Sequence, residues 1–272
     1  MGVVGVDHIA IGVEDLDAGV ALYTALLGAA PRVHNGAPPG EAAVFELSNT
    51  RIVLLQPGTR RQGVCALGLA VLDTDRAALQ LEAAGLACTP CERLGTWDAP
   101  VSARWALAAE RTRGLALQLV QREDGTLPAA RSLEADQVEA LDHVVIRSSE
   151  PDAACALYGH SLGIRLALDR VFGGARMLFF RTGGVTIEVI GDASAAAADS
   201  FFGLAYRVRD LHAAHLRLEA AGFALTELRA GRKFGTHVFS VREATSGVPT
   251  LFIRDASRDS PAAPVGTRSE GS

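Results

Sequence analysis

The sequence predicts an α+β fold of four strand–helix–strand units arranged as two tandem halves, and three repeats lead to this prediction. An Asp-His dipeptide within an apolar run occurs at His8 and returns 135 residues later, at His143. A Leu-Tyr-x-x-x-Leu-Gly pattern follows each dipeptide at that same offset. A third run, Leu-Glu-Ala-Ala-Gly, ends at Gly85 and again 137 residues later, at Gly222. Because near-constant offsets mark an internal repeat, the chain is a tandem duplication.

Each half contains two units, and in each unit a strand is followed by a helix and then by further strands. Residues 6–13 form an apolar run broken only by the Asp7-His8 dipeptide and a glycine, which is typical of a buried strand. Asp15 or Asp17 begins a helix that ends at Gly28. The further elements predicted for this half are strands around 43–47, 51–56 and 67–71, a helix from Asp73 to Gly85, and strands near 87–91, 101–108 and 115–121.

The second half repeats the order of the first. Its first unit is predicted as strand 141–147, helix 151–161 closed by Gly163, and strands near 165–170, 175–181 and 184–190. Its second unit is predicted as strand 204–208, helix 210–221 ended by Gly222, and strands near 224–229, 236–242 and 249–254. Turn-forming and charged residues indicate a linker, so the predicted organisation is domain 1–123, linker 124–137, domain 138–256 and disordered tail 257–272.

Composition narrows the classes of function. With 49% hydrophobic and 21% charged residues, the 272-residue chain has ordinary globular composition and enough length for two domains. A net charge of −5 leaves no broad basic face for phosphate backbones, so we expect no nucleic-acid partner. No apolar run reaches the roughly 18–20 residues of a membrane helix. We therefore expect a small-molecule ligand, no membrane contact, and a monomer or a homodimer.

We expect the protein to be cytoplasmic. The amino terminus has no basic leader before its apolar stretch, unlike a secretory signal. Four cysteines are too few for a disulfide framework in a chain of this length. Cys88 and Cys91 have CxxC spacing, but no second pair accompanies them and the repeat has Leu225 and Leu228 instead. We interpret them as ordinary strand cysteines.

In this ordered recurrence of the Asp-His dipeptide and the helix-end pattern, the chain resembles the vicinal oxygen chelate superfamily, also called the glyoxalase, bleomycin resistance and extradiol dioxygenase superfamily. The resemblance covers residues 3–255. It implies that each pair of units forms a glyoxalase-like domain, a cupped mixed sheet around a pocket where a divalent metal chelates neighbouring oxygens of a substrate. In that family the metal ligands come from the first and last strands of paired units.

The resemblance assigns a metal-ligand slot to the first strand and to the last strand of each unit. In the first half these slots hold His8 and Val53, then Ala66 and Gln118. Valine and alanine have no donor atom for a metal. The first half therefore reads as a duplicated scaffold, with His8 and Gln118 as vestigial slots.

The second half keeps two donors, His143 and Glu188, while a glycine and a leucine occupy the two slots of its last unit. His237, on a neighbouring strand, is the candidate for a third ligand, which would complete a two-histidine, one-carboxylate set for Zn, Fe, Mn, Co or Ni. In one alternative the halves exchange units, so that His143 and Glu188 meet Gln118. In another, the protein binds no metal.

Strand alternation places arginines in the second cup. Side chains at i, i+2 and i+4 share a face of a strand, so Arg147 shares the face of His143, and Arg207 that of Gly203. The guanidinium fork suits a carboxylate or a phosphate, so we expect both arginines to hold an anionic ligand. The alternative interpretation is a structural ion pair between Glu188 and one of these arginines.

Two functions follow. The first is a lyase, isomerase or dioxygenase acting on a small oxygenated, anionic metabolite, with Glu188 and His237 as catalytic residues and Arg147 and Arg207 binding the substrate. An extradiol dioxygenase is disfavoured, because the resemblance would take its ligands partly from the slots that hold a glycine and a leucine. The second is a non-catalytic binding or sequestering protein, like the bleomycin resistance members. The sequence favours the enzyme.

Overall fold

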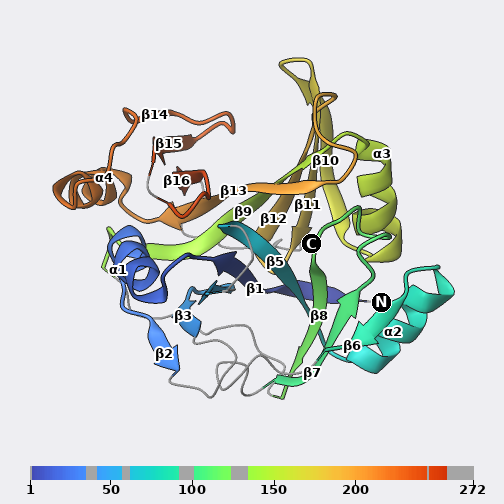
Figure 1. Cartoon of the computed structure of the whole chain (residues 1–272). Coiled ribbons are helices and arrows are strands. Elements are labelled where there is room, and N and C mark those ends of the chain that lie inside the picture. The colour runs from blue at the N-terminus through green and yellow to red at the C-terminus, as the bar shows by residue number, and fades with distance from the viewer. Residues whose placement is uncertain are drawn as a thin grey trace, which may run out of the picture.

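The computed structural model describes residues 2–34, 42–56, 62–91, 101–123, 134–243 and 245–255. Each half of the chain forms one eight-stranded mixed sheet, the first within residues 3–122 and the second within 138–255 (Figure 1). The predicted α+β architecture of two tandem halves is therefore confirmed. Most of the predicted linker and all of the predicted tail lie outside the described residues.

The first sheet is built from β1 (Val3–Gly12), β2 (Arg32–His34), β3 (Ala42–Glu46), β4 (Arg51–Leu55), β5 (Gly63–Val71), β6 (Cys88–Pro90), β7 (Val101–Leu107) and β8 (Leu117–Arg122). Their order across the sheet is β2-β3-β4-β1-β5-β8-β7-β6. At its centre β1 pairs in parallel with β4 of its own unit and antiparallel with β5 of the next. Only the short β2 has no counterpart among the predicted strands.

The second sheet is built from β9 (Val138–Ser148), β10 (Arg165–Phe172), β11 (Ala175–Thr182), β12 (Val185–Gly191), β13 (Ser200–Val208), β14 (Arg229–Ala230), β15 (Thr236–Val241) and β16 (Thr250–Asp255). Their order is β10-β11-β12-β9-β13-β16-β15-β14. Because β9 pairs with β13, the two units of this half join each other, and the exchange of units between halves does not occur. The strand expected near 224–229 is reduced to β14 and an isolated bridge from Leu225 to Val241.

The helices begin at the acidic residues that the sequence indicates. Asp15 caps α1 (Leu16–Leu27), Asp73 caps α2 (Thr74–Ala83) and Asp210 caps α4 (Leu211–Ala220), each by accepting a backbone hydrogen bond. The segment predicted as helix 151–161 differs: α3 (Pro151–Ala154) continues as the π-helical η2 (Cys155–Ser161). There the hydrogen bonds span one residue more, as from the N–H of Leu162 to the carbonyl of Leu157. None of the described helices is long and apolar enough to cross a membrane.

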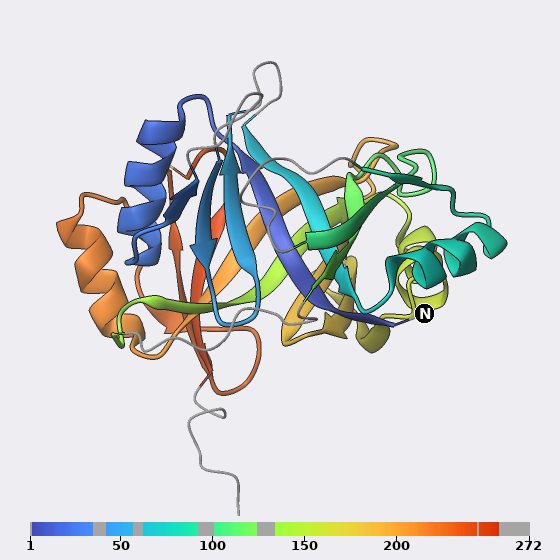
Figure 2. The same cartoon turned by 90° about the horizontal axis from the view of Figure 1, so that it is seen from below.

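One continuous apolar core joins the two halves. Buried side chains of both sheets and of all four α-helices belong to it, among them Ile9 and Ile11 of β1 and Val144 and Ile146 of β9. In both views α1 lies beside α4 and α2 beside α3, so each helix pair combines the two halves (Figures 1 and 2). Since alternate residues of β1 and β9 enter this core, the intervening ones, starting with His8 and His143, face the two cups.

Candidate functional site

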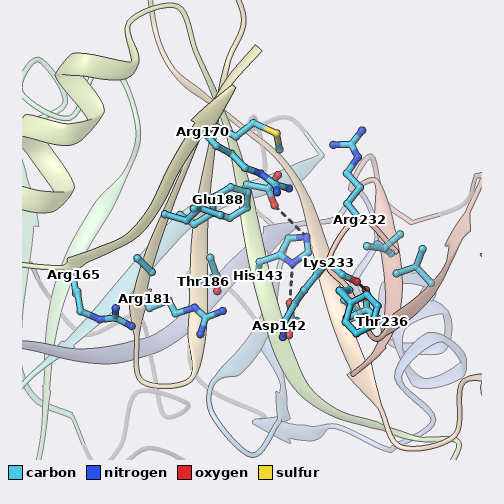
Figure 3. Close-up of a pocket in the computed structure, with 18 of the residues that line it drawn as sticks. Asp142, His143, Arg165, Arg170, Arg181, Thr186, Glu188, Arg232, Lys233 and Thr236 are labelled. Atoms are coloured by element: carbon cyan, nitrogen blue, oxygen red, sulfur yellow. Dashed lines mark hydrogen bonds and ion pairs between the residues drawn. The ribbon is translucent and has the colours of Figure 1, made fainter. Parts of the chain in front are cut away.

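The cup of the second half contains a cavity of about 860 Å³. Side chains of β9, β10, β11, β12, β15 and β16 line it, together with residues around β14 (Figure 3). Two features distinguish this cavity, an acid–imidazole group on β9 and β12 and a surplus of basic side chains.

His143 stands between two carboxylates in this cavity. Its Nδ1 lies 3.0 Å from Oδ2 of Asp142, and its Nε2 lies 3.7 Å from Oε2 of Glu188 (Figure 3). The first distance is a hydrogen bond that fixes the ring, whereas the second is too long for one. The ring face and the Glu188 carboxylate therefore remain available to a ligand.

The strands that hold these groups are fixed by their apolar residues. On β9, Val144 and Ile146 are buried in the core, and on β12 the same holds for Ile187 and Val189. Because side chains alternate, the residues between them face the cup. Parallel pairing then places Thr186 beside His143 and Glu188 beside Val145. The glutamate therefore lies two residues further along the strand direction than the histidine.

Basic side chains outnumber acidic ones in the cavity wall. Six line it, against two carboxylates and one histidine; they are Arg165, Arg170, Arg181, Arg229, Arg232 and Lys233. Lys233 is paired with the buried Asp255 outside the cavity. The guanidinium carbon of Arg170 lies 5.8 Å from the ring centroid of Phe179, and Figure 3 shows Arg170 at the same end of the cavity as Glu188. The cavity is therefore suited to a negatively charged ligand.

The donor atoms present do not fit a resident metal ion. Ala205 of β13 pairs with His143, and Leu251 of β16 pairs with Ala205. Neither alanine nor leucine has a donor atom for a metal. Gly203 leaves no room for a ligand side chain, since a Cβ there would lie 2.5 Å from the carbonyl oxygen of Pro249. Among the described residues no group of three His, Cys, Asp or Glu side chains converges as a metal site would require.

Three residues predicted for this site lie away from the cavity. His237 is exposed on β15, where the buried Thr236 and Val238 on either side of it line the cavity instead. Arg147 lies toward the end of β9, exposed, with its guanidinium carbon 3.8 Å from the ring centroid of Phe202.

Arg207 is the third of these residues, and it contacts acidic side chains of β9. Its Nε lies 3.4 Å from Oε2 of Glu139, and its Nη1 lies 3.9 Å from Oδ1 of Asp142. The structure therefore does not place Arg207 against Glu188, as the alternative of a structural ion pair would require. Arg207 does not line the cavity, but its ion pair with Asp142 connects it to a residue that does.

The cup of the first half holds a buried ion-pair cluster instead of a polar cavity wall. Arg122 donates to both carboxylate oxygens of Asp7, at 2.6 and 2.8 Å, and Nδ1 of His8 lies 2.8 Å from the same carboxylate. Burial alone would raise the pKa of Asp7, but the hydrogen bonds from Arg122 and His8 and their positive charge hold it well below its usual range. This cluster ties together strands of both units.

The two vestigial slots of the first half lie in one row of the sheet. His8 pairs with Gly68, and Gly68 pairs with Gln118 on the other side. The imidazole of His8 covers Gly68, where a Cβ would lie 2.4 Å from the ring. Val53 is fully buried in a small aliphatic cluster with Ala42 and Val44. The structure thus places His8 and Gln118 on either side of Gly68, with the His8 ring packed over the glycine and the aliphatic cluster on the same face.

Two sets of site residues were missed by the sequence analysis. The first is Asp142. It belongs to the repeated dipeptide, and its position beside His143 could have indicated the hydrogen bond between the two side chains. The second set is the arginines of β10 and β11, which could be placed in the cavity only from the register of the two hairpins that join β10, β11 and β12. Gly173-Gly174 and Gly183-Gly184 are two-residue hairpin turns, and counting back from the second one places Arg181 opposite Thr186.

Comparison with known proteins gives a family for the second half and a fold for the whole chain. Residues 140–255 match the family model described as the Glyoxalase/Bleomycin resistance protein/Dioxygenase superfamily. No curated protein matches the chain by sequence.

Solved structures resemble nearly the whole chain. A halotolerant catechol dioxygenase, BphC, has a TM-score of 0.71 at 12% identity, covering 92% of this chain and 86% of that one. An Mn(II)-bound glyoxalase from Novosphingobium aromaticivorans has a TM-score of 0.70 at 16% identity, covering 92% and 82%. A mutant of 4-hydroxymandelate synthase from Streptomyces coelicolor has a TM-score of 0.67 at 16% identity, covering 95% and 96%. The second half of the chain therefore belongs to the glyoxalase/bleomycin resistance protein/dioxygenase superfamily, and the first half repeats the same fold.

Proposed function

We propose that the second-half cavity binds a small oxygenated anion and transfers a proton on it, as a lyase or an isomerase. The observation that carries this proposal is the position of His143, hydrogen-bonded to Asp142 on one side and 3.7 Å from Glu188 on the other, inside a predominantly basic cavity. Enzymes of several reaction types share the fold, which supports a catalytic role without choosing the reaction.

The three side chains have separate tasks in this proposal. Asp142 accepts the Nδ1 proton of His143 and so orients Nε2 toward Glu188. Glu188 is the base that removes a proton from the carbon next to a substrate carbonyl. His143 is the acid that donates a proton to the oxygen on which charge develops. Such a step forms an enol and leaves Glu188 protonated. Return of this proton to a different carbon completes an isomerisation, whereas its transfer to a leaving group on the neighbouring carbon completes an elimination.

No step of this mechanism uses a metal, because among the described residues no third His, Cys, Asp or Glu side chain converges with His143 and Glu188 as a metal site would require. The Zn, Fe, Mn, Co or Ni ion expected from the resemblance is therefore left out of the proposal. The acid–base role expected for His237 passes to His143, since His237 lies on the other face of β15. The expected binding of an anion is kept, with the arginines of the cavity wall in place of Arg147.

We also propose a cytoplasmic location for the protein. None of the four cysteines forms a disulfide, which suits a reducing compartment. A drug-sequestering protein of the bleomycin resistance kind is less consistent with the cavity, because six basic side chains repel a cationic drug.

Solvent-deuterium exchange tests the proposed chemistry without knowledge of the full reaction. The purified protein is incubated in D2O with a panel of 2-oxo and 2-hydroxy carboxylates, and exchange at carbon is followed by proton NMR. We expect exchange with at least one compound, falling at least about 100-fold in Glu188→Gln and in His143→Gln. Arg176→Ala, on the outer face of β11 and paired with Asp152 and Asp169, is the control and should exchange at the wild-type rate.

Two outcomes would overturn the proposal. Binding of a panel compound without any exchange would identify a sequestering protein. Exchange that survives in both the Glu188 and the His143 variant would place the chemistry elsewhere in the molecule.

A further inference from the structure

We propose that the cavity contains a second anion site, formed by Arg165 and Arg181, and that its ligand is a two-headed anion. One head is the reacting oxygenated group at His143 and Glu188, and the other is a carboxylate or phosphate held by the arginine pair. This inference deepens the proposed function and rests on it for the position of the reacting head alone.

Four cavity-lining residues form one row across four neighbouring strands. Arg165 of β10 faces Arg181 of β11, Arg181 faces Thr186 of β12, and Thr186 faces His143 of β9. All four line the cavity, and Figure 3 shows the two guanidinium groups at one end of it with Thr186 between them and His143. With neighbouring strands about 4.8 Å apart, the backbone of Arg181 lies about 10 Å from that of His143.

Within the part of the chain that the structure describes, no acidic side chain neutralises these two arginines. Among the described residues neither forms an ion pair with a carboxylate, whereas Arg176, on the same strand as Arg181, pairs with Asp152 and Asp169 at 2.6 and 2.8 Å. Like charges that face each other across a strand pair repel. A bound oxyanion removes that repulsion, and two planar forks suit its several oxygens.

Three other basic residues of the cavity are less suited to a second head. Lys233 is already paired with Asp255. Arg232 stacks on Phe172, with its guanidinium carbon 4.8 Å from the ring centroid, and Arg170 lies 5.6 Å from the same ring. These side chains add to the positive potential, but the Arg165 and Arg181 pair alone combines adjacent guanidinium groups with a direct row to His143.

The wall between the two heads determines the linker of the ligand. Thr186 lies between the arginine pair and His143, and Phe179, which faces Glu188 across β11 and β12, lies beside this row. The linker therefore passes over the Thr186 hydroxyl, a polar contact, with the apolar ring of Phe179 at its side. Since the arginine side chains extend toward the centre of the cavity, we expect the two charged groups of the ligand to be on the order of 5–10 Å apart.

Calorimetric titration with dicarboxylates of increasing length tests the second site directly. The probes are acetate, malonate, glutarate, adipate and pimelate at fixed, low salt. We expect the tightest binding among the longer dianions, with acetate at least about tenfold weaker. Arg165→Ala and Arg181→Ala should each weaken the best dianion by about tenfold, because each loses one charge-assisted contact at the exposed end of the cavity.

Matched variants separate charge from geometry. Arg181→Lys keeps the charge but loses the fork, so its affinity should lie between those of the wild type and Arg181→Ala. Arg176→Ala should bind every probe as the wild type does. Both arginines are exposed, so an unchanged melting temperature shows that each variant is folded. A second series, 3-phosphonopropionate beside glutarate, shows whether the arginine pair takes phosphate oxygens or a carboxylate.

The outcomes distinguish this inference from the proposed function. If the arginine variants weaken dianions while no compound shows deuterium exchange, the second site stands and the proposed chemistry fails. If dianions bind equally well to the wild type and both alanine variants, or no tighter than acetate, the second site is refuted and the proton-transfer proposal is untouched. Tighter binding of a cationic probe than of any dianion would refute it as well.

Discussion

Asn49 of the first half forms two hydrogen bonds with the backbone of Leu141 in the second half. Its Nδ2 donates to the Leu141 carbonyl at 2.8 Å, and its Oδ1 accepts from the Leu141 N–H at 3.0 Å. Leu141 directly precedes the Asp142-His143 dipeptide. A turn between β3 and β4 of the first half therefore fixes the strand that carries the proposed acid of the second.

Replacing Asn49 by alanine tests this connection. Asn49→Ala leaves a buried N–H and carbonyl unpaired, and we expect the free energy of unfolding to fall by about 1–3 kcal/mol. Urea denaturation measures the loss. Ser48→Ala is the control, because Ser48 bonds to Glu139 through its backbone N–H. Equal stability of Asn49→Ala and the wild type would show that the two bonds contribute nothing.

The Asp7 cluster predicts a pH dependence of stability. Since the folded-state pKa of Asp7 is lowered, its contribution is present above the unfolded pKa of about 3.9 and is lost as the pH falls toward the folded value. We expect Asp7→Asn to be less stable by about 3–5 kcal/mol at pH 7, because the buried guanidinium of Arg122 loses the opposite charge of Asp7. Guanidinium denaturation at pH 7, 5 and 3 should show the gap narrowing only at the lowest pH. A gap that is constant with pH would contradict the lowered pKa.

The two histidines of the repeated dipeptide should behave differently. His143→Ala removes the proposed acid and should abolish proton transfer and weaken ligand binding. His8→Ala opens a space over Gly68 in a packed cup and should lower stability with little effect on the ligand. Thermal melting and dianion titration on both variants provide the comparison. The reverse ranking in the titration would mean that the ligand occupies the other cup.

Arg113 should contribute to the joint between the halves. Its Nε lies 2.8 Å from Oδ1 of Asp199, a carboxylate with no exposed side-chain surface, and the hydrogen bond raises the pKa of Arg113. Arg113→Met should cost about 2–4 kcal/mol, since Asp199 stays buried without its partner. Arg111→Ala, exposed and nearby, is the control. Because one core joins the halves, both variants and the wild type should unfold in a single transition in differential scanning calorimetry; two transitions would contradict a shared core.

The fold was predictable because it rests on features that recur in the sequence. Each helix except α3 begins after the aspartate that indicates it, and the paired dipeptides lie on the central strands of their sheets. The constant offset also identified Glu188 as the counterpart of Val53, and the structure places both on the fourth strand of their unit.

The site was less predictable, because it depends on register. His237 was assigned to the cup by its strand alone, but Thr236 and Val238 occupy the inward positions of β15, so a shift of one residue reverses the face. Arg147 was placed by correct alternation from His143, yet the exposed end of β9 lies beyond the cavity wall. Both errors concern where a strand meets the cavity, which local pattern does not specify.

Because both halves share one apolar core, the second half depends on the first for stability, although the polar cavity lies in the second half. The first half contributes side chains to the same apolar interior as the second, and Asn49 anchors the strand that bears His143. Substitutions inside the first cup are thus restrained by stability and not by a ligand, while those in the shared core are restrained by the needs of both halves. The first half has thus become part of the structure that supports the site of the second half.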